Sequence, residues 1–175
     1  MKSRFYVSFI GCVTIALTIF IVHAQQQPKK DKMQGMAGSD TDAMNKRGDH
    51  VMGFDHNKTT HHFRLLSEGG TIEITANDAA DTESRDQIRS HLGHISKMFA
   101  AGNFNAPMLI HEQTPPGVPV MQKLKSEIEY RFDETERGAS IPISTENSQA
   151  LKAIHKFLRF QIKEHKTGDS LEVNR

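Results

Sequence analysis

The chain has 175 residues, of which 22 are lysine or arginine and 21 are aspartate or glutamate, so its formal net charge at pH 7 is +1. A balance of this kind produces no extended field of one sign, and it argues against a protein that binds nucleic acid through a basic surface. The single cysteine excludes a framework of disulfide bonds, so packing alone must stabilise the fold.

The first 24 residues have the composition of a signal peptide. Lys2 and Arg4 give a positive start, Phe5–Val22 is an almost uninterrupted apolar run, and Val22-His23-Ala24 supplies a cleavage site. This pattern predicts export, either to the periplasm or by secretion. An uncleaved membrane anchor is one alternative, since about 18 apolar residues can just span a bilayer. Lipidation at Cys12 is another, although the apolar run continues well past that cysteine.

Cleavage would also change the chemistry available to the mature chain. The 22 basic residues would fall to 20 with the loss of Lys2 and Arg4, against 21 acidic residues. Cys12 would leave with the signal peptide, so the mature protein would carry no thiolate ligand. We therefore expect no nucleic-acid partner, and contact with a membrane only if the segment stays uncleaved.

Residues 25–50 are predicted to form a disordered leader. They are rich in glutamine, lysine, aspartate, glycine and methionine, and they contain neither an aromatic residue nor an apolar period. Spaced methionines can bind Cu(I) or Ag(I) when a flexible chain wraps around the ion, and the alternative is a linker that merely contains methionine. The methionines and the histidine of this region are Met33, Met36, Met44, His50 and Met52.

Residues 51–170 are expected to form a single domain, with 171–175 as a tail. This part of the chain contains two hairpin patterns, each followed by a helical pattern. The first hairpin runs from Phe63 to Thr75 and the second from Glu129 to Ser144, with alternating apolar and polar residues on both sides of a turn.

Both helical patterns have an apolar stripe, and both have start and stop signals. Asp81 or Thr82 is predicted to cap the first helix and Thr145 the second, while Gly102 and Gly168 end them. The stripe residues are Ile88, Leu92, Ile95 and Phe99 in the first helix, and Leu151, Ile154, Leu158 and Ile162 in the second.

The resulting prediction is an α+β fold made of two ββα units. One four-stranded antiparallel sheet with two helices on one face is the simplest way to bury both hairpins and both helices. Pro142 is expected on a strand at the sheet edge. The proline-rich connector from Gly102 to Lys125 is long for so small a domain, and such loops are often functional. The strand side chains expected to face the helices are Phe63, Leu65, Ile72, Ile74, Ile128, Tyr130, Phe132, Ile141 and Ile143.

Histidines gather in the first unit. His61 and His62 open its first strand, and His91, His94 and Met98 share one flank of its helix. The strand alternation turns His61 toward the helices and His62 outward. Nitrogen and thioether ligands without thiolate suit copper or a related soft metal in an oxidising compartment, and imidazoles also suit zinc. We therefore predict an exported metal-binding protein.

His111, in the connector, is a further candidate ligand. It also supports an alternative, a small secreted enzyme in which His111 or His61 is the general acid or base and Asp55 or Glu112 orients it. A third alternative is an envelope protein whose hairpin edge or connector binds another protein.

Ordinary structural roles compete with each of these interpretations. A histidine at the border of an apolar face is often amphipathic filling, and Met98 can simply fill the core. His165 lies near the end of the second helix, where the helix dipole accounts for a basic residue.

The segment MGFDHNKTTHHF at 52–63, together with Arg85–Arg89 and Glu164–Asp169, resembles a family of small exported bacterial proteins. The resemblance covers roughly residues 51–170 and supplies no catalytic residues. Some members carry the label aspartate carbamoyltransferase, an enzyme that needs a Ser-Thr-Arg-Thr-Arg phosphate loop and two domains. The nearest match here is Ser144–Asn147, in a chain too short for both domains.

Overall fold

The computed structural model describes residues 31–174, with side chains described from residue 41 onward. The predicted signal peptide and the first residues of the predicted leader lie outside the described residues. Residues from Asp31 onward form one compact unit. Among the helices of this described part, none is both long enough and apolar enough to cross a membrane.

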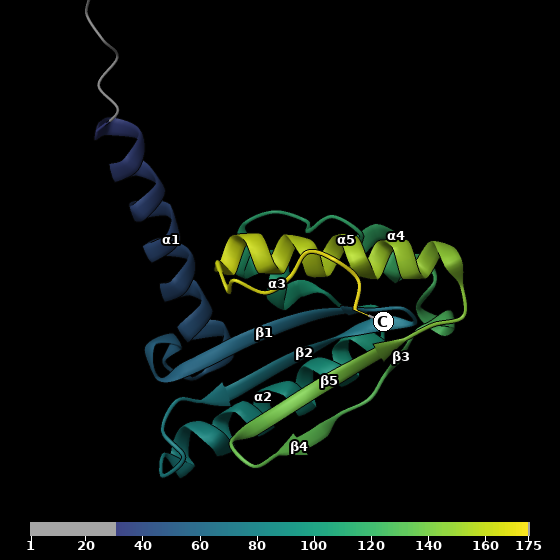
Figure 1. Cartoon of the computed structure of the whole chain (residues 1–175), viewed down its shortest axis with the longest axis horizontal. Helices are drawn as coiled ribbons and strands as arrows, with labels where there is room; N and C mark the ends of the chain where they lie inside the picture. Colours follow the sequence, from purple (N-terminus) through teal and green to yellow (C-terminus); the bar gives the residue numbers. More distant parts are fainter. Residues whose placement is uncertain (1–30, 175) are drawn as a thin grey trace, which may run out of the picture. The chain divides into compact units, whose positions relative to one another are not determined.

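A five-stranded sheet forms the centre of the fold (Figure 1). Its strands are β1 (Thr59–Leu66), β2 (Gly69–Ala76), β5 (Gly138–Ser144), β3 (Glu129–Tyr130) and β4 (Asp133–Thr135). The order is β1-β2-β5-β3, with β4 also pairing with β5, and all these pairings are antiparallel. The predicted α+β class is confirmed, whereas the plain four-stranded sheet with two helices is wrong.

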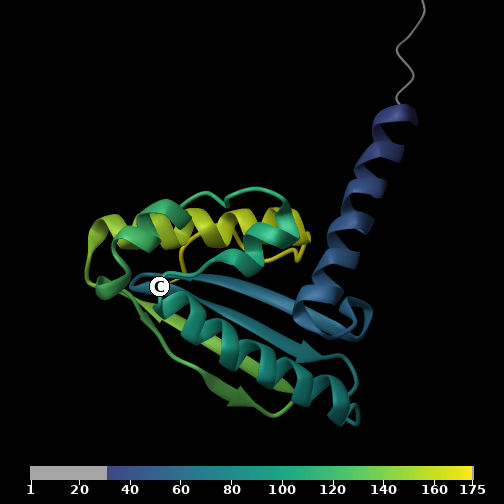
Figure 2. The ribbon, with the colours of Figure 1, turned by 180° about the vertical axis from the view of Figure 1, so that it is seen from behind.

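The two helices that follow the hairpins, α2 (Thr82–Ala100) and α5 (Ser148–His165), pack on the same face of the sheet, as predicted. A single cavity is lined by Phe63 and Ile72 of the strands together with Leu92 of α2 and Phe157 of α5. Figures 1 and 2 show both helices against this face. The strand side chains predicted to face the helices are all buried or partly buried in the core.

Pro142 explains why the predicted second hairpin is divided. Tyr130 pairs with Ile143 and Asp133 with Ser140, so β3 and β4 continue one register along β5. Between them the Arg131 N–H donates to the Pro142 carbonyl at 3.0 Å. Pro142 has no N–H with which to return this bond, and the ladder breaks there. The prediction that β5 lies at the edge is wrong, because β2 pairs with its other side.

The N-cap of α2 matches the prediction, and the N-cap of α5 does not. Asp81 caps α2 by accepting a hydrogen bond from the Ser84 N–H at 3.0 Å, as expected. Asn147, not Thr145, caps α5. The Thr145 hydroxyl instead donates to the carbonyl of Glu127 and accepts the Asn147 N–H at 3.1 Å, so it lies beside the cap and does not provide it.

The proline-rich connector contains two short helices, α3 (Asn105–His111) and α4 (Val118–Lys123). Two 3-10 turns, η1 (His56–Lys58) and η2 (Lys125–Glu127), complete the helical elements of the described residues. Gly117 allows α4 to approach α5, since a Cβ there would stand 2.2 Å from the Ala153 carbonyl oxygen.

Residues predicted to be a disordered leader form a helix instead, α1 (Asp31–Met52). Met44, Gly48 and Met52 are buried along one stripe of it. Arg47 fixes the helix further by donating from Nε to the Ile110 carbonyl at 2.9 Å. The prediction of disorder is wrong for residues 31–50, because two methionines at helical spacing provide the buried surface that aromatic residues would otherwise provide.

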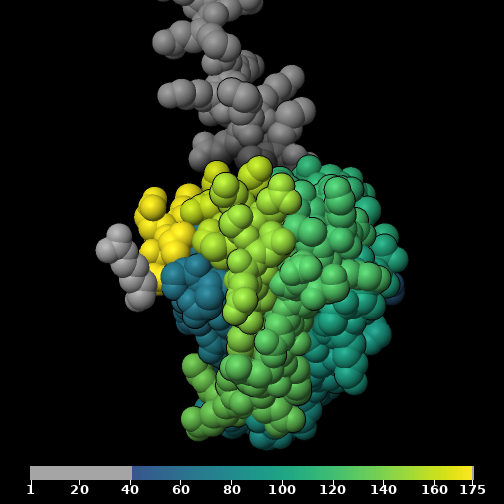
Figure 3. Space-filling view, turned by 90° about the vertical axis from the view of Figure 1, so that its right-hand side faces the viewer, coloured from purple at the N-terminus to yellow at the C-terminus, as the bar shows by residue number. Residues whose placement is uncertain are grey.

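The C-terminal tail covers the outer edge of β1. The Asn174 N–H donates to the Leu65 carbonyl at 2.9 Å, and an isolated parallel bridge joins Asn174 to Leu66. The Asp169 carboxylate accepts the Phe63 N–H at 2.9 Å. Figure 3 shows the yellow tail beside the blue β1 region on this side of the molecule.

Candidate functional site

His61 lies on the inner face of β1, as the strand period predicts. Its ring stacks on that of His165, with centroids 5.6 Å apart and planes 9° apart. Phe54 and Phe63 flank it at centroid distances of 6.1 and 6.4 Å. The Nε2 atom of His61 is buried and has no hydrogen-bond partner among the described residues.

His111, at the end of α3, extends this group of rings. Its ring meets that of His165 edge to face, with centroids 5.1 Å apart and planes 84° apart. The side chain is fully shielded from solvent, and Nε2 lies 3.0 Å from the Gln161 Oε1. With the Gln161 oxygen as the acceptor, Nε2 carries the hydrogen and Nδ1 presents a lone pair. That Nδ1 is buried without a hydrogen-bond partner among the described residues, with a Glu164 oxygen 3.9 Å away. The Gln161 Nε2 is itself buried without a hydrogen-bond partner among the described residues.

Burial keeps these imidazoles uncharged. It lowers the pKa of His61 to about 4 and that of His165 to about 3, and the neighbouring histidines add to both shifts. Burial also lowers the pKa of His111, against the opposing effects of Gln161 and Glu164. At neutral pH the group therefore consists of neutral rings, whose unprotonated nitrogens can act as ligands.

A cavity of about 70 Å³ joins these histidines to His91 and Met52. His91 lies on α2 and meets Phe54 edge to face at a centroid distance of 5.6 Å. Burial, followed by the nearby His94, lowers its pKa to about 4. None of the described residues that line this cavity is acidic. We refer to His61, His111 and His165, with His91 beside them, as the histidine cluster.

Two larger hollows border the cluster next to α1. One, of about 320 Å³, is lined by Met44, Met52 and His56 together with His61 and His165. The other, of about 350 Å³, is lined by Met44, Arg47, His111, Glu112 and Glu164, among others. Solvent and small solutes can therefore approach the histidine cluster on both sides of this helix.

The structure brings together three of the six predicted ligands, His61, His91 and His111. The other three lie elsewhere. His62 is on the outer face of the sheet, where its Nδ1 lies 2.9 Å from an Asp169 carboxylate oxygen. His94 is exposed on α2, and Met98 is partly buried against the core without lining the cavity.

His165 was missed as a ligand by the sequence reasoning. The helix dipole is a sufficient reason for a basic residue at that position, so the sequence gives no separate indication of a ligand. A signal was nonetheless present, because His165 follows Ile162 by three residues and Leu158 by seven, and so extends the apolar stripe of α5.

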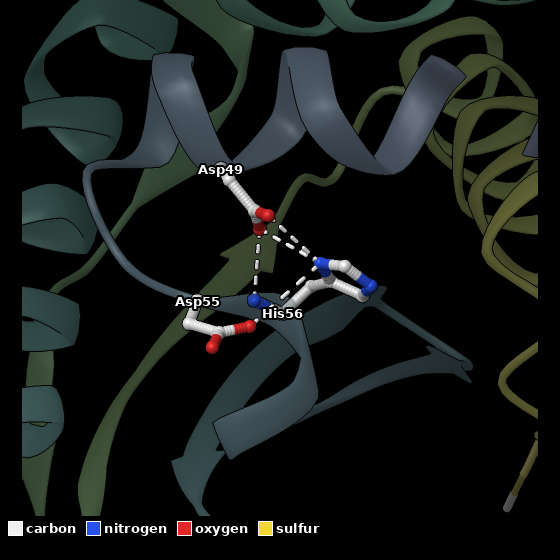
Figure 4. A group of neighbouring side chains, drawn as sticks. All are labelled: Asp49, Asp55 and His56. Atoms are coloured by element: carbon white, nitrogen blue, oxygen red, sulfur yellow. Dashed lines mark hydrogen bonds and ion pairs between the residues drawn. The ribbon is translucent and has the colours of Figure 1, made fainter. Parts of the chain in front are cut away.

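A second group with potential ligands lies where α1 meets η1. One ligand atom each from Asp49, Asp55 and His56 lies within 4.8 Å of the other two (Figure 4). Hydrogen bonds within the chain account for this arrangement. Asp49 accepts both the backbone N–H and the Nδ1 of His56, at 2.8 and 2.9 Å, and Asp55 caps η1 through the Asn57 N–H. These contacts fasten the turn to the end of α1.

The carboxylates considered for an enzyme do not orient the histidines of the cluster. Asp55 caps η1, and Glu112 forms an ion pair with Arg47 at 3.2 Å. Among the described contacts, neither carboxylate is hydrogen-bonded to His61 or His111. The pairing of Asp55 or Glu112 with His61 or His111 is therefore not formed in this arrangement, and the carboxylate nearest to His111 is that of Glu164.

No protein-family model matches the chain, and neither a curated protein nor a solved structure matches it. The resemblance to a family of exported bacterial proteins accordingly stays a prediction, as do export itself and the bound metal. The functional interpretation depends on the geometry of the histidine cluster.

Proposed function

We propose that this protein binds copper or a related soft metal ion in the cavity of the histidine cluster, as an exported metal-binding protein. The observation that carries this proposal is the pair of bare ring nitrogens, His61 Nε2 and His111 Nδ1. Buried polar atoms nearly always have a partner, because leaving one unsatisfied costs free energy. The two rings each contact that of His165. No three ring nitrogens of the cluster lie within 4.8 Å of one another among the described residues, so a metal ion would supply the missing partner once the rings turn toward it.

The chemistry of the cavity favours a soft ion. Its described lining offers imidazole nitrogens and the thioether of Met52, with no carboxylate. Such ligands suit copper in particular, whereas calcium and magnesium need oxygen ligands. Zinc can use three imidazoles, but it prefers a complete tetrahedral set. The lowered pKa values of His61 and His165 mean that no proton has to leave these rings before an ion binds at neutral pH.

Binding requires the rings to turn toward one another. The stacked His61 and His165 rings, 5.6 Å apart, present their faces rather than their nitrogens to each other. Rotation about the side-chain torsions of His61 and His165 would aim their nitrogens at the cavity while His111 stays held by Gln161. Sites of this kind commonly close only when the ion arrives.

Calorimetric titration of the purified protein with Cu(I), Cu(II) and Zn(II) tests the proposal. We expect stoichiometric binding of copper by the wild-type protein. His61→Phe and His165→Phe should each lower the affinity by more than about tenfold, because each removes a ligand. His94→Phe is the matched control, since His94 is exposed on α2 and should be dispensable.

Two results would overturn the proposal. The first is the absence of copper or zinc binding by the wild-type protein. The second is wild-type affinity in a folded His61→Phe, His165→Phe double variant. Circular dichroism of each variant establishes that it is folded before its affinity is interpreted.

A further inference from the structure

A groove between α4 and α5 carries positive charge. It has a volume of about 530 Å³ and is lined by Lys123 of α4 and by Lys152 and Lys156 of α5. All three lysines are exposed, and none of the described residues that line the groove is acidic. Val120, of which 39% is exposed, adds apolar surface to the same groove. The groove therefore combines three cations with an apolar wall.

A hollow of the opposite charge lies next to this groove. Its volume is about 690 Å³, and none of the described residues that line it is basic. Four exposed carboxylates line it, from the β1–β2 turn, from η2, from β3 and from the segment before α5: Glu68, Glu127, Glu129 and Glu146. We refer to this hollow as the acidic hollow and to the first as the basic groove.

The chain passes twice from one of these surfaces to the other. Leu124 lines the basic groove, and Ser126, two residues later, lines the acidic hollow. Glu146 lines the acidic hollow, and Gln149 lines the basic groove. Figures 1 and 2 show α4, β3 and the start of α5 at the same end of the domain, and Figure 3 faces this end. The two surfaces of opposite charge are therefore neighbours.

These charges are not neutralised within the protein. None of the lysines of the basic groove and none of the glutamates of the acidic hollow forms an ion pair with another described residue. Surfaces that associate commonly carry complementary potentials, so that a positive patch on one molecule meets a negative patch on the other. Here both patches occur on one chain.

We propose that this end of the protein is the interface of a twofold symmetric dimer. In such a dimer the same surface of each copy meets that of the other. With the symmetry axis between the basic groove and the acidic hollow, the lysines of each copy face the glutamates of its partner, and both contacts form at once. The exposed surface of Val120 would be covered in the same step, which adds an apolar contribution.

A second copy fits these observations better than other occupants do. An acidic peptide would neutralise the basic groove alone and leave the glutamates unpaired. A metal ion is not favoured at the acidic hollow, because no three of its carboxylates lie within 4.8 Å of one another among the described residues. An open head-to-tail chain would form one charged contact per interface, whereas the closed dimer forms two.

The first test is sedimentation velocity of the purified protein at about 0.1 M and about 1 M sodium chloride. We expect a dimer at the lower concentration and a monomer at the higher one, because the range of charge interactions falls from about 10 Å to about 3 Å between them. Two charge-reversal variants, Lys152→Glu with Lys156→Glu and Glu127→Lys with Glu129→Lys, should each be monomeric at low salt, since like charges then face each other.

The matched control is Lys46→Glu with Lys58→Glu. It changes the net charge as much as the lysine variant does, at exposed positions on α1 and η1 that lie outside both surfaces. It should sediment as the wild type does. None of the substituted residues lines the cavity of the histidine cluster, so copper binding should be the same in all these variants. The test is thus independent of the proposed function.

The second test mixes the two charge-reversal variants in equal amounts. The side chains introduced at 152 and 156 then meet those introduced at 127 and 129, while the unchanged surfaces of the two molecules meet each other. Both contacts are attractive again, and the mixture should sediment as a dimer at low salt although each variant alone is a monomer. Circular dichroism establishes that each variant is folded.

Three results would overturn the proposal. One is a wild-type protein that is monomeric at low salt. Another is a pair of folded variants that still form dimers on their own, or whose mixture stays monomeric. The third is a wild-type species larger than a dimer, which would indicate an open head-to-tail chain.

Discussion

At the scale of single residues, burial decides how the histidines behave. His61 and His165 stack on each other at the edge of the core, where both side chains are only partly exposed. His94, on the same helix flank as His91, is exposed. A residue type that carries charge readily near neutral pH is therefore held neutral at the cluster, where its nitrogens can serve as ligands.

The stability of the protein should accordingly fall in mild acid. The pKa of His61 is about 4 and that of His165 about 3 in the folded protein, against 6.5 in the unfolded chain. The contribution of these two histidines to the free energy of unfolding is complete above pH 6.5. It decreases as the pH falls from 6.5 toward the pKa values of the folded protein, because in that range only the unfolded chain takes up protons. Thermal unfolding between pH 7.5 and 4 should show this decline.

Replacement of both residues, as His61→Phe and His165→Phe, should flatten the dependence of the melting temperature on pH. The His94→Phe variant should keep the slope of the wild type. An unchanged slope in the double variant would mean that other groups cause the acid sensitivity.

The sequence predicts those positions of the histidine cluster that depend on the period of one strand or one helix. The period of a strand is enough to place His61 on the inner face. The period of a helix places His91 and His94 on one flank, but the edge of the buried face of α2 falls between them, and no pattern within the helix marks that edge. His165 joins the group only because α5 crosses β1 at that point, which is a property of the tertiary arrangement.

At the scale of elements, glycines show where backbones approach one another closely. At Gly70 of β2 a Cβ would stand 2.2 Å from the Leu158 Cδ1 and 2.5 Å from the Arg64 carbonyl oxygen. At Gly93 of α2 the nearest atoms belong to Phe132 and are 3.7 Å away, which is ordinary contact. The two positions therefore predict opposite responses to the same substitution.

Gly70→Ala should destabilise the protein by about 1–3 kcal/mol, because the new methyl group separates α5 from the sheet. Gly93→Ala should stabilise it by roughly 0.5–1 kcal/mol, since alanine favours the helix and meets no obstacle. Urea denaturation of the two variants measures both changes. Equal effects of the same sign would contradict the described packing of α5 on β2.

The two hairpins and the two long helices could be predicted because their patterns are local. The division of the second hairpin into β3 and β4 could not be predicted. It depends on which neighbouring strand lies on the side of β5 where Pro142 lacks an N–H. The helix α1 was missed for a related reason. Met44 and Met52 become a buried stripe only where α1 packs against the rest of the domain, α3 in particular, and composition alone does not include that partner.

At the scale of the whole molecule, α1 belongs to the domain rather than preceding it. Its removal would expose the core surface that Met44 and Met52 cover. Burial of one methionine side chain contributes roughly 2 kcal/mol. A fragment that begins at Gly53 should therefore melt several degrees below one that begins at Asp31.

Calorimetry on the two fragments tests this expectation. The Met44→Leu, Met52→Leu variant of the longer fragment is the control, and it should melt near the longer wild-type fragment because the covered area is conserved. Equal melting temperatures for the short and long wild-type fragments would mean that residues 31–52 do not contribute to the stability of the domain.

The tail that runs along β1 has a consequence for the solubility of the protein. An outer strand of eight residues offers a row of backbone donors and acceptors to any other strand it meets. Asp169 already occupies the N–H of Phe63, and Asn174 occupies the carbonyl of Leu65. The last residues of the described chain thus cover part of the edge of β1. A protein lacking them would expose this edge, and we expect β1 strands of two molecules to pair and the protein to aggregate.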